Sequence, residues 1–195
     1  MTNDQTKHTG TTHPEPFVSR FVGRIAAGGA VLDVAAGSGR NGLAFWNAGH
    51  HVTFVDRNTD GLTRLHGEDG VEIVQADLET DAAVFSEPGR LAGRVFDAIV
   101  VVNYLHRPLF PHLLALLHPG GLLIYSTFMR GNEAFGKPSN SDFLLQPGEL
   151  LTHVGFANVI AFEEGVVVRS DGSKVMRQSI AALKRSPTTR RGSRS

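Results

Sequence analysis

The chain has 195 residues, a formal net charge of zero and no cysteine. This length suits one domain with a sizeable core. The absence of cysteine excludes disulfides, thiolate metal sites and cysteine nucleophiles. No apolar run approaches the roughly 18–20 residues that a membrane-spanning helix needs, and the polar N-terminus lacks the apolar stretch of a signal peptide. We therefore expect a cytoplasmic protein without a membrane partner.

Charge is spread unevenly along the chain. Five basic residues and no acid fall within the last 12 positions, which leaves 14 basic against 19 acidic residues in the rest. A mildly acidic body does not favour nucleic acid as a partner. We expect three segments: a flexible N-terminus (1–14), a folded domain (15–184) and a disordered basic tail (185–195). The oligomeric state is not readable from the sequence.

The first half of the chain shows strands and helices in alternation. Apolar spacing and turn signals carry this reading. In chain order we expect a helix at 15–27, a strand at 30–35, a helix at 41–48, a strand at 51–56, a helix at 58–66 capped by Asn58, and a strand at 71–75.

The second half continues the alternation and then breaks it. We expect a helix near 82–85, a strand at 95–102, a helix at 109–117, a strand at 122–128, a loop at 129–140, a helix at 147–153, and strands at 159–164 and 174–183. Alternation predicts a parallel sheet, and the Asp-Gly turn near residue 171 predicts a closing antiparallel pair. The expected fold class is α/β, with a Rossmann-like, doubly wound, mostly parallel seven-stranded sheet.

Residues 31–42 (VLDVAAGSGRNG) form the most informative motif. They read as a buried strand, a glycine turn and a helix start, with Asp33 inside the strand. Such a turn brings bare backbone and unpaired N–H groups close to a ligand. Gly37, Gly39 and Gly42 also fit the dinucleotide fingerprint. A buried Asp33 needs donors, and the N–H groups of the glycine turn are the nearest candidates.

Polar residues follow three further strands, where an open α/β sheet binds ligands. Asp56 lies 17 residues beyond Gly39, a spacing that suits a carboxylate on the ribose of an adenosine; its alternative role is to cap the helix that follows. Asp77 follows the third strand and is either an adenine ligand or an ordinary turn residue. Asn103 and Tyr104 follow the fourth strand.

Taken in order, these motifs resemble the class I S-adenosylmethionine-dependent methyltransferases. The resemblance rests on Asp33-x-Ala35-x-Gly37-x-Gly39, Asp56, Gln75-Ala76-Asp77 and Pro119-Gly120-Gly121, and covers roughly residues 15–184. Residues 37–41 and 139–150 resemble the tellurite-resistance methyltransferase-like branch of small bacterial methyltransferases. The resemblance implies S-adenosyl-L-methionine as cofactor. The cofactor-binding residues that it implies are Asp33, Ala35, Gly37, Gly39, Arg40, Asn41, Asp56, Arg57, Asp77, Leu78 and Asn103.

The resemblance also indicates an acceptor side. Asn103 and Tyr104 would lie beside the methyl group, where an aromatic face favours the cationic sulfonium. Phe128 is a second aromatic candidate, although core packing is its plainer role. Tyr104 and His106 are the catalytic candidates if the acceptor starts protonated; a polar loop residue is the plainer reading of His106. Among cations, Arg107, Arg130 and Lys137 are candidates to hold an anionic substrate, or are simply solvated.

We expect in-line methyl transfer to an unidentified small-molecule acceptor, and no metal site. A NAD(P)-dependent oxidoreductase is the first alternative; the Tyr-x-x-x-Lys pair of short-chain dehydrogenases is missing, since Pro108 and Met129 stand at that spacing. A non-catalytic binding module of the same fold is the second alternative. Methylation of nucleic-acid bases is disfavoured, because the chain has Asn103-Tyr104-Leu105-His106 where that branch has Asn/Asp-Pro-Pro-aromatic.

Overall fold

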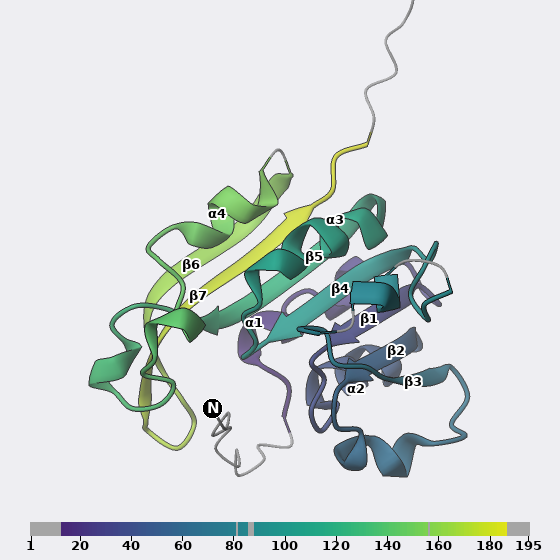
Figure 1. Ribbon diagram of the computed structural model, residues 1–195, viewed down its shortest axis with the longest axis horizontal. Coiled ribbons are helices and arrows are strands. Elements are labelled where there is room, and N and C mark those ends of the chain that lie inside the picture. The colour runs from purple at the N-terminus through teal and green to yellow at the C-terminus, as the bar shows by residue number, and fades with distance from the viewer. Residues whose placement is uncertain (1–12, 81, 86–87, 156, 187–195) are drawn as a thin grey trace, which may run out of the picture.

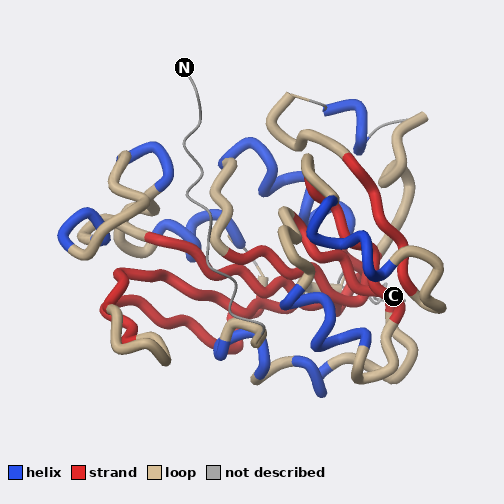
Figure 2. Tube along the Cα trace, turned by 90° about the horizontal axis from the view of Figure 1, so that it is seen from below, coloured by secondary structure: helices blue, strands red, loops and turns tan. Residues whose placement is uncertain are grey.

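A seven-stranded sheet forms the middle layer of the computed structural model, which describes residues 13–80, 82–85, 88–155 and 157–186. Helices cover both faces of the sheet (Figures 1 and 2). The strands are β1 (Ala30–Val34), β2 (His51–Asp56), β3 (Val71–Gln75), β4 (Phe96–Val102), β5 (Leu117–Phe128), β6 (Asn158–Val168) and β7 (Lys174–Leu183).

The strand order is β3-β2-β1-β4-β5-β7-β6. The first five strands pair in parallel, and β7 lies antiparallel between β5 and β6. The expected mostly parallel sheet with a closing antiparallel pair is confirmed. The chain order reverses between β1 and β4, so a crevice opens beyond the carboxyl ends of these two strands, where doubly wound sheets bind ligands.

Two apolar cores lie on opposite faces of the sheet. Helices α3 (Phe110–Leu116) and α4 (Glu149–Val154) pack with one core, and α1 (Pro16–Ser19) and α2 (Arg40–Trp46) pack with the other. Strand β4 is buried along nearly its whole length because both cores cover it, which explains why its sequence is apolar apart from Asp97. Short 3-10 turns make up the other helical elements: Val22–Arg24, Asp60–Leu65, Ala82–Phe85, Arg107–Leu109, Asn132–Ala134 and Ser141–Phe143.

Three expected helices differ from the prediction, and one of them, near 82–85, is a 3-10 turn with the expected limits. The helix expected at 15–27 breaks into α1 and a 3-10 turn at Val22–Arg24, which ends where Ile25 becomes extended (φ −97°, ψ 139°). The helix expected at 58–66 is a 3-10 segment whose N-cap is Thr59 and not the expected Asn58. The Asn58 side chain instead forms an Asx turn, accepting a hydrogen bond from the N–H of Asp60 at 2.9 Å. The apolar spacing identified the buried faces and not the helix type.

Two strands begin or end beyond their expected limits. Strand β5 starts at Leu117, five residues before the expected start. Leu117 pairs with Phe96, and the register then shifts so that Ala98 pairs with Leu122. Strand β6 continues to Val168 because the β6–β7 hairpin extends past the end of β5. Both extensions come from pairing with a neighbouring strand, which overrides the local turn signals.

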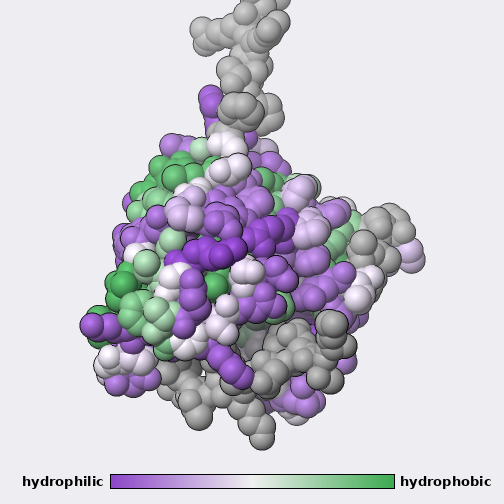
Figure 3. Space-filling view, turned by 60° about the vertical axis from the view of Figure 1, so that its left-hand side comes forward, coloured by the Kyte–Doolittle hydropathy of each residue, from purple (hydrophilic) through white to green (hydrophobic). Residues whose placement is uncertain are grey.

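Much of the two terminal segments lies outside the described residues. The expected flexible N-terminus (1–14) and basic tail (185–195) are described only at 13–14 and 185–186. Among the described residues, no helix has the length and apolar character required to cross a membrane. The face in Figure 3 is mostly hydrophilic, with smaller hydrophobic patches between the polar side chains.

Glycine is required at position 42, inside α2. A Cβ placed there would lie 2.4 Å from the Phe54 ring and 2.8 Å from Asp33 Oδ2. We expect Gly42→Ala to lower the free energy of unfolding by about 1–3 kcal/mol, since overpacking outweighs the better helix propensity of alanine. Urea denaturation measures the change. Gly23→Ala is the matched control, because a Cβ at Gly23 meets nothing within 4 Å; equal effects of the two changes would contradict the packing argument.

Candidate functional site

The glycine turn after β1 adopts a left-handed backbone at alternate positions. The φ angles of Ala35, Gly37 and Gly39 are 53°, 56° and 75°. Glycine adopts this conformation freely, whereas for Ala35 it is uncommon and strained. Gly39 is the N-cap of α2 and has no side chain to satisfy the helix N–H groups. The turn therefore presents backbone donors at the crevice edge.

Asp33 ties the end of β1 to α2. Its side chain is 1% exposed, and Oδ2 accepts a hydrogen bond from the N–H of Gly42 at 2.8 Å. The donor is therefore in the first turn of α2, and the expected donors in the glycine turn, at 37–39, do not supply it. Burial raises the pKa of Asp33 from 3.8 to about 7, against the opposing effect of the Gly42 hydrogen bond.

Asp56 joins the glycine turn to the segment after β2. Its Oδ2 accepts from the N–H of Gly37 at 2.7 Å, and its Oδ1 accepts from the N–H of Asn58 at 2.9 Å. The carboxylate thus caps the following turn and also holds the glycine turn. A surface cavity of about 410 Å³ lies here, lined by Gly37, Asp56, Arg57, Asn58, Asp60 and Gly61.

Within this cavity the space next to the Gly37 backbone is open, whereas two neighbouring glycines are closely packed. A Cβ at Gly61 would lie 2.8 Å from the Gly37 carbonyl oxygen, and a Cβ at Gly39 would lie 2.7 Å from Leu62. A Cβ at Gly37 would meet nothing within 4 Å. Gly61 and Gly39 are therefore packing glycines, whereas Gly37 faces open space in the cavity. These features fit the close approach of a ligand to the backbone.

Arg40 and Asn41 hold the N-terminal segment over the glycine turn. Arg40 Nη1 donates to the His13 carbonyl at 2.9 Å, and the N–H of Glu15 donates to Asn41 Oδ1 at 2.9 Å. Asn41 is only 5% exposed. The structure therefore gives both residues a positioning role, and their expected contact with a cofactor stays a prediction.

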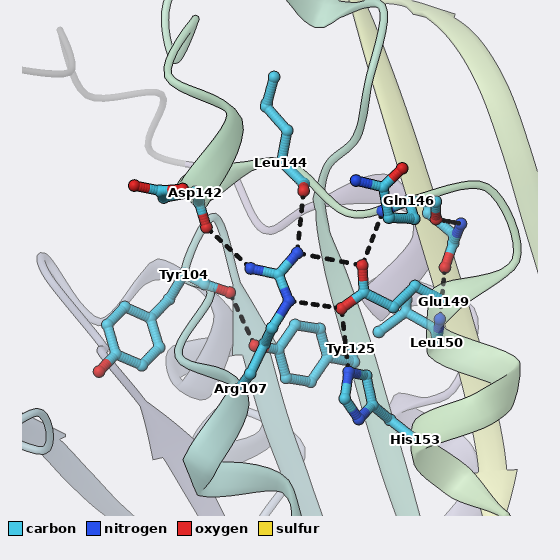
Figure 4. A network of polar contacts seen from close by, with 10 residues as sticks. Tyr104, Arg107, Tyr125, Asp142, Leu144, Gln146, Glu149, Leu150 and His153 are labelled. Carbon is cyan, nitrogen blue, oxygen red and sulfur yellow. Dashed lines mark hydrogen bonds and ion pairs between the residues drawn. The ribbon is translucent and has the colours of Figure 1, made fainter.

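The segment after β3 lies near Tyr104. Asp77 Oδ1 accepts from the N–H of Glu79 at 3.0 Å, and the Leu78 side chain is buried. Burial, together with the nearby carboxylates of Glu79 and Asp77, raises the pKa of Tyr104 well above its usual range. The Tyr104 side chain points away from Arg107 and Glu149 (Figure 4). Because the pKa of Tyr104 is raised, its hydroxyl is protonated at neutral pH and can donate a hydrogen bond.

Asn103 carries the unusual backbone of this edge, with φ 59°. Its Oδ1 accepts from Arg177 Nη1 at 2.7 Å. Arg177 is 3% exposed and was missed at the sequence level. Its signal was a lone cation in the otherwise neutral stretch 175–183 of β7. The His106 side chain makes no hydrogen bond to any described residue, so its catalytic role stays a prediction.

Arg107 makes structural contacts within the protein. Its guanidinium forms a bidentate pair with Glu149 (2.6 and 3.0 Å) and donates to the carbonyls of Asp142 and Leu144 (2.9 and 3.0 Å) (Figure 4). His153 adds a contact of 3.0 Å to Glu149. Arg107 was a candidate for an anionic substrate; the structure instead makes it a latch that fastens the 141–149 segment to the residues after β4.

The remaining candidates are Phe128, Arg130, Lys137 and a metal site. Phe128 is 2% exposed and packs with Leu144 and Val175, which confirms its core role. Arg130 is exposed, and its N–H donates to the Leu145 carbonyl. Lys137 is exposed in the same loop. Within the described part of the chain, no group of three His, Cys, Asp or Glu residues is arranged for a metal ion.

The strand order, the glycine turn after β1 and the acid at the end of β2 define a class: the chain has the fold of the class I S-adenosylmethionine-dependent methyltransferases. No family model matches the sequence. Among curated proteins it is 33% identical over 135 residues to the demethylmenaquinone methyltransferase of Clavibacter sepedonicus, covering 65% of this chain and 49% of that protein. The chain therefore spans about half the length of this relative.

Solved structures agree on the fold. TehB from Haemophilus influenzae superposes with a TM-score of 0.72 at 19% identity, covering 90% of this chain and 64% of that one. A SAM-dependent methyltransferase from Methanosarcina mazei superposes with a TM-score of 0.64 at 15% identity, covering 90% of this chain and 100% of that one. The resemblance drawn from the sequence motifs is thus confirmed at the level of the fold.

The buried Asp33 makes stability depend on pH. The folded protein holds this proton more tightly than the unfolded chain, so the stabilisation is present below about pH 4 and is lost as the pH rises through about 7. The parent should lose stability between pH 4 and pH 8, whereas Asp33→Asn should not. The free energy of unfolding of Asp33→Asn relative to the parent should therefore rise by about a few kcal/mol from pH 4 to pH 8, measured by urea denaturation at both values. Asp60→Asn, which removes an exposed carboxylate, is the control. A difference independent of pH would contradict the prediction.

The Arg107–Glu149 latch predicts a measurable coupling. Burial alone would raise the pKa of Glu149, but hydrogen bonds from Arg107, the Gln146 N–H and His153 hold it at about 2. The stabilisation is therefore present above about pH 4.5 and is lost as the pH falls toward 2.

A double-mutant cycle of Arg107→Ala and Glu149→Ala at pH 7 should give a coupling of about 1–2 kcal/mol. The exposed pair Arg20–Glu163, with side chains 51% and 55% exposed, is the control and should give about 0–1 kcal/mol. Equal couplings for the two pairs would count against the latch.

Proposed function

We propose that this protein is an S-adenosylmethionine-dependent methyltransferase that transfers a methyl group to a small-molecule acceptor. The observation that carries the proposal is the contact between Asp56 and the glycine turn, 2.7 Å from Gly37 N, at the edge of an open cavity. The fold and the name of the 33% identical relative support it. The names of the structural neighbours, which include a SAM-dependent methyltransferase, agree with it.

The residues of the cavity fit the cofactor. Each Asp56 oxygen accepts one backbone hydrogen bond, and a carboxylate oxygen can accept a second, which leaves capacity for the two ribose hydroxyls. Asp77 and the Leu78 N–H would bind the adenine. The backbone at Ala35, Gly37 and Gly39, with Asp33, Arg40 and Asn41 behind it, would hold the methionine part, and Arg57 and Asn103 would border the site.

When bound, the cofactor supplies a methyl group on a positively charged sulfur, which is already an activated leaving group. The task of the chain is then to hold the acceptor in line with that methyl group, an effect that contributes up to about 7–11 kcal/mol. Asn103 and Tyr104 border this position. Tyr104 keeps its proton at neutral pH and orients the acceptor as a donor. If the acceptor starts protonated, His106 is the candidate base.

Binding separates this proposal from its alternatives. The wild-type protein should bind S-adenosylmethionine and S-adenosylhomocysteine with micromolar dissociation constants in calorimetry and should not bind NAD(H). Preferential binding of NAD(H) would favour the oxidoreductase alternative. Cofactor binding without release of S-adenosylhomocysteine in a broad acceptor screen would favour the non-catalytic module.

Asp56→Ala tests the ribose contact. A charge-assisted hydrogen bond contributes about 1.5–3 kcal/mol, so the dissociation constant for S-adenosylhomocysteine should rise roughly tenfold or more. Asp69→Ala, which removes an exposed acid outside the cavity lining, is the matched control and should leave it unchanged. Circular dichroism checks that both variants fold. An unchanged affinity in folded Asp56→Ala would remove Asp56 from the site.

A further inference from the structure

Arg177 is a buried cation whose hydrogen bonds all go to neutral acceptors. It lies on β7 opposite Phe128 of β5 and is 3% exposed. Nη1 donates to Asn103 Oδ1 at 2.7 Å, Nη2 donates to the Ser126 carbonyl and Oγ at 2.9 and 3.0 Å, and Nε donates to Ser126 Oγ at 3.3 Å. No described carboxylate lies within ion-pair distance of it. A buried charge without a counter-ion is costly.

Two arginines and one carboxylate act on Arg177 from beyond ion-pair distance. Burial lowers its pKa to about 10, and Arg169 and Arg40 lower it too, while Glu15 opposes them; it stays charged at pH 7. Glu15 is itself paired with Arg40 at 3.8 Å. The guanidinium carbons of Arg177 and Arg169 both lie within 6 Å of the Phe128 ring centroid, at 5.0 and 5.8 Å. An anion bound here would offset this positive charge.

Arg107 shows what full pairing looks like a few residues from Asn103. Its guanidinium is neutralised by the bidentate contact with Glu149, and two carbonyls accept from two further N–H groups (Figure 4). The charge of Arg107 is therefore already compensated within the protein. Arg177 is more deeply buried than Arg107 and carries the same positive charge, but no described carboxylate is paired with it.

Arg177 also fixes the orientation of the Asn103 amide. A guanidinium can only donate, so the amide must turn its oxygen to Arg177 and its Nδ2 donor away. No described residue accepts from Nδ2, and this atom is not among the buried, unsatisfied atoms of the structure. Asn103 follows β4 directly, at the crevice where β4 and β1 lie side by side. The Nδ2 donor is thus accessible, beside a buried positive charge.

We propose that the methyl acceptor carries a carboxylate, which receives a hydrogen bond from Asn103 Nδ2 and charge compensation from Arg177. This inference rests on the proposed function. One amide donor beside one guanidinium suits the two oxygens of a carboxylate, whereas a phosphate or sulfate group presents more oxygens than this pair can serve. Arg177 then determines specificity, selecting acids over their neutral amides.

Acetate and its neutral counterpart acetamide probe this site. The full chain is titrated with each, with and without saturating S-adenosylhomocysteine, and the side-chain ¹⁵N signals of Arg177 Nε and Asn103 Nδ2 are followed by NMR. Acetate should shift both signals and acetamide neither. The proposal would be overturned if acetate shifted neither signal. It would also be overturned if the titration gave a lower dissociation constant for sulfate than for acetate.

Asn103→Asp is the decisive variant. It places a carboxylate against Arg177, which keeps the buried cation paired, and aspartate tolerates the positive φ of this position. Asn103→Asp removes the Nδ2 donor and also neutralises the Arg177 guanidinium, so the affinity for acetate should fall about tenfold or more. Arg177→Lys retains the positive charge, so its affinity for acetate should fall less than that of Asn103→Asp. Arg90→Gln, which removes an exposed arginine paired with Glu72, is the control and should not change acetate binding.

S-Adenosylhomocysteine has a carboxylate of its own, and the two sources give different results. If Asn103→Asp weakens S-adenosylhomocysteine as much as acetate, the anion is that of the cofactor and the proposal is overturned. Undiminished acetate binding in Asn103→Asp also overturns it. If S-adenosylhomocysteine does not bind the wild-type chain, the proposed function fails instead, and the titration without it still decides whether the carboxylate site exists.

Discussion

The buried contact between Asp33 and the N–H of Gly42 is the constraint on which the ligand edge depends. It joins the end of β1 to the first turn of α2, so the backbone between them must close into the tight left-handed turn at 35–39. The same closure brings Gly37 N within 2.7 Å of Asp56 at the end of β2. The contact is possible only because residue 42 has no side chain.

Two arginines on the acceptor side illustrate opposite uses of a guanidinium. Arg107 is satisfied by Glu149 and by carbonyls of the 141–149 segment, and so it fastens that segment to the sheet. Arg177 has only neutral partners and orients Asn103. The first is an internal structural cross-link, whereas the second leaves a charge and a donor for a ligand. Neither role follows from residue type alone, since both are loop or strand cations in the sequence.

The sequence predicted the fold better than the details of its elements. Strands 51–56, 71–75 and 174–183 matched their expected limits, because β-forming residues and turn signals coincide there. The helix expected at 15–27 breaks in two and ends at the extended residue Ile25, and β5 starts early because Leu117 pairs with Phe96. Local patterns report which side chains are apolar and do not report the partner that a neighbouring element supplies.

By itself, the sequence determined the strand alternation, the glycine turn and the order of acids at 33, 56 and 77, because each is a local pattern of a few residues. Only the tertiary structure decided which polar groups are already satisfied. Asp33 takes its hydrogen bond from Gly42, Arg107 is paired 42 residues away with Glu149, and Arg177 meets Asn103 74 residues away. Burial and partners set the charge state and availability of these groups, and both depend on contacts between distant parts of the chain.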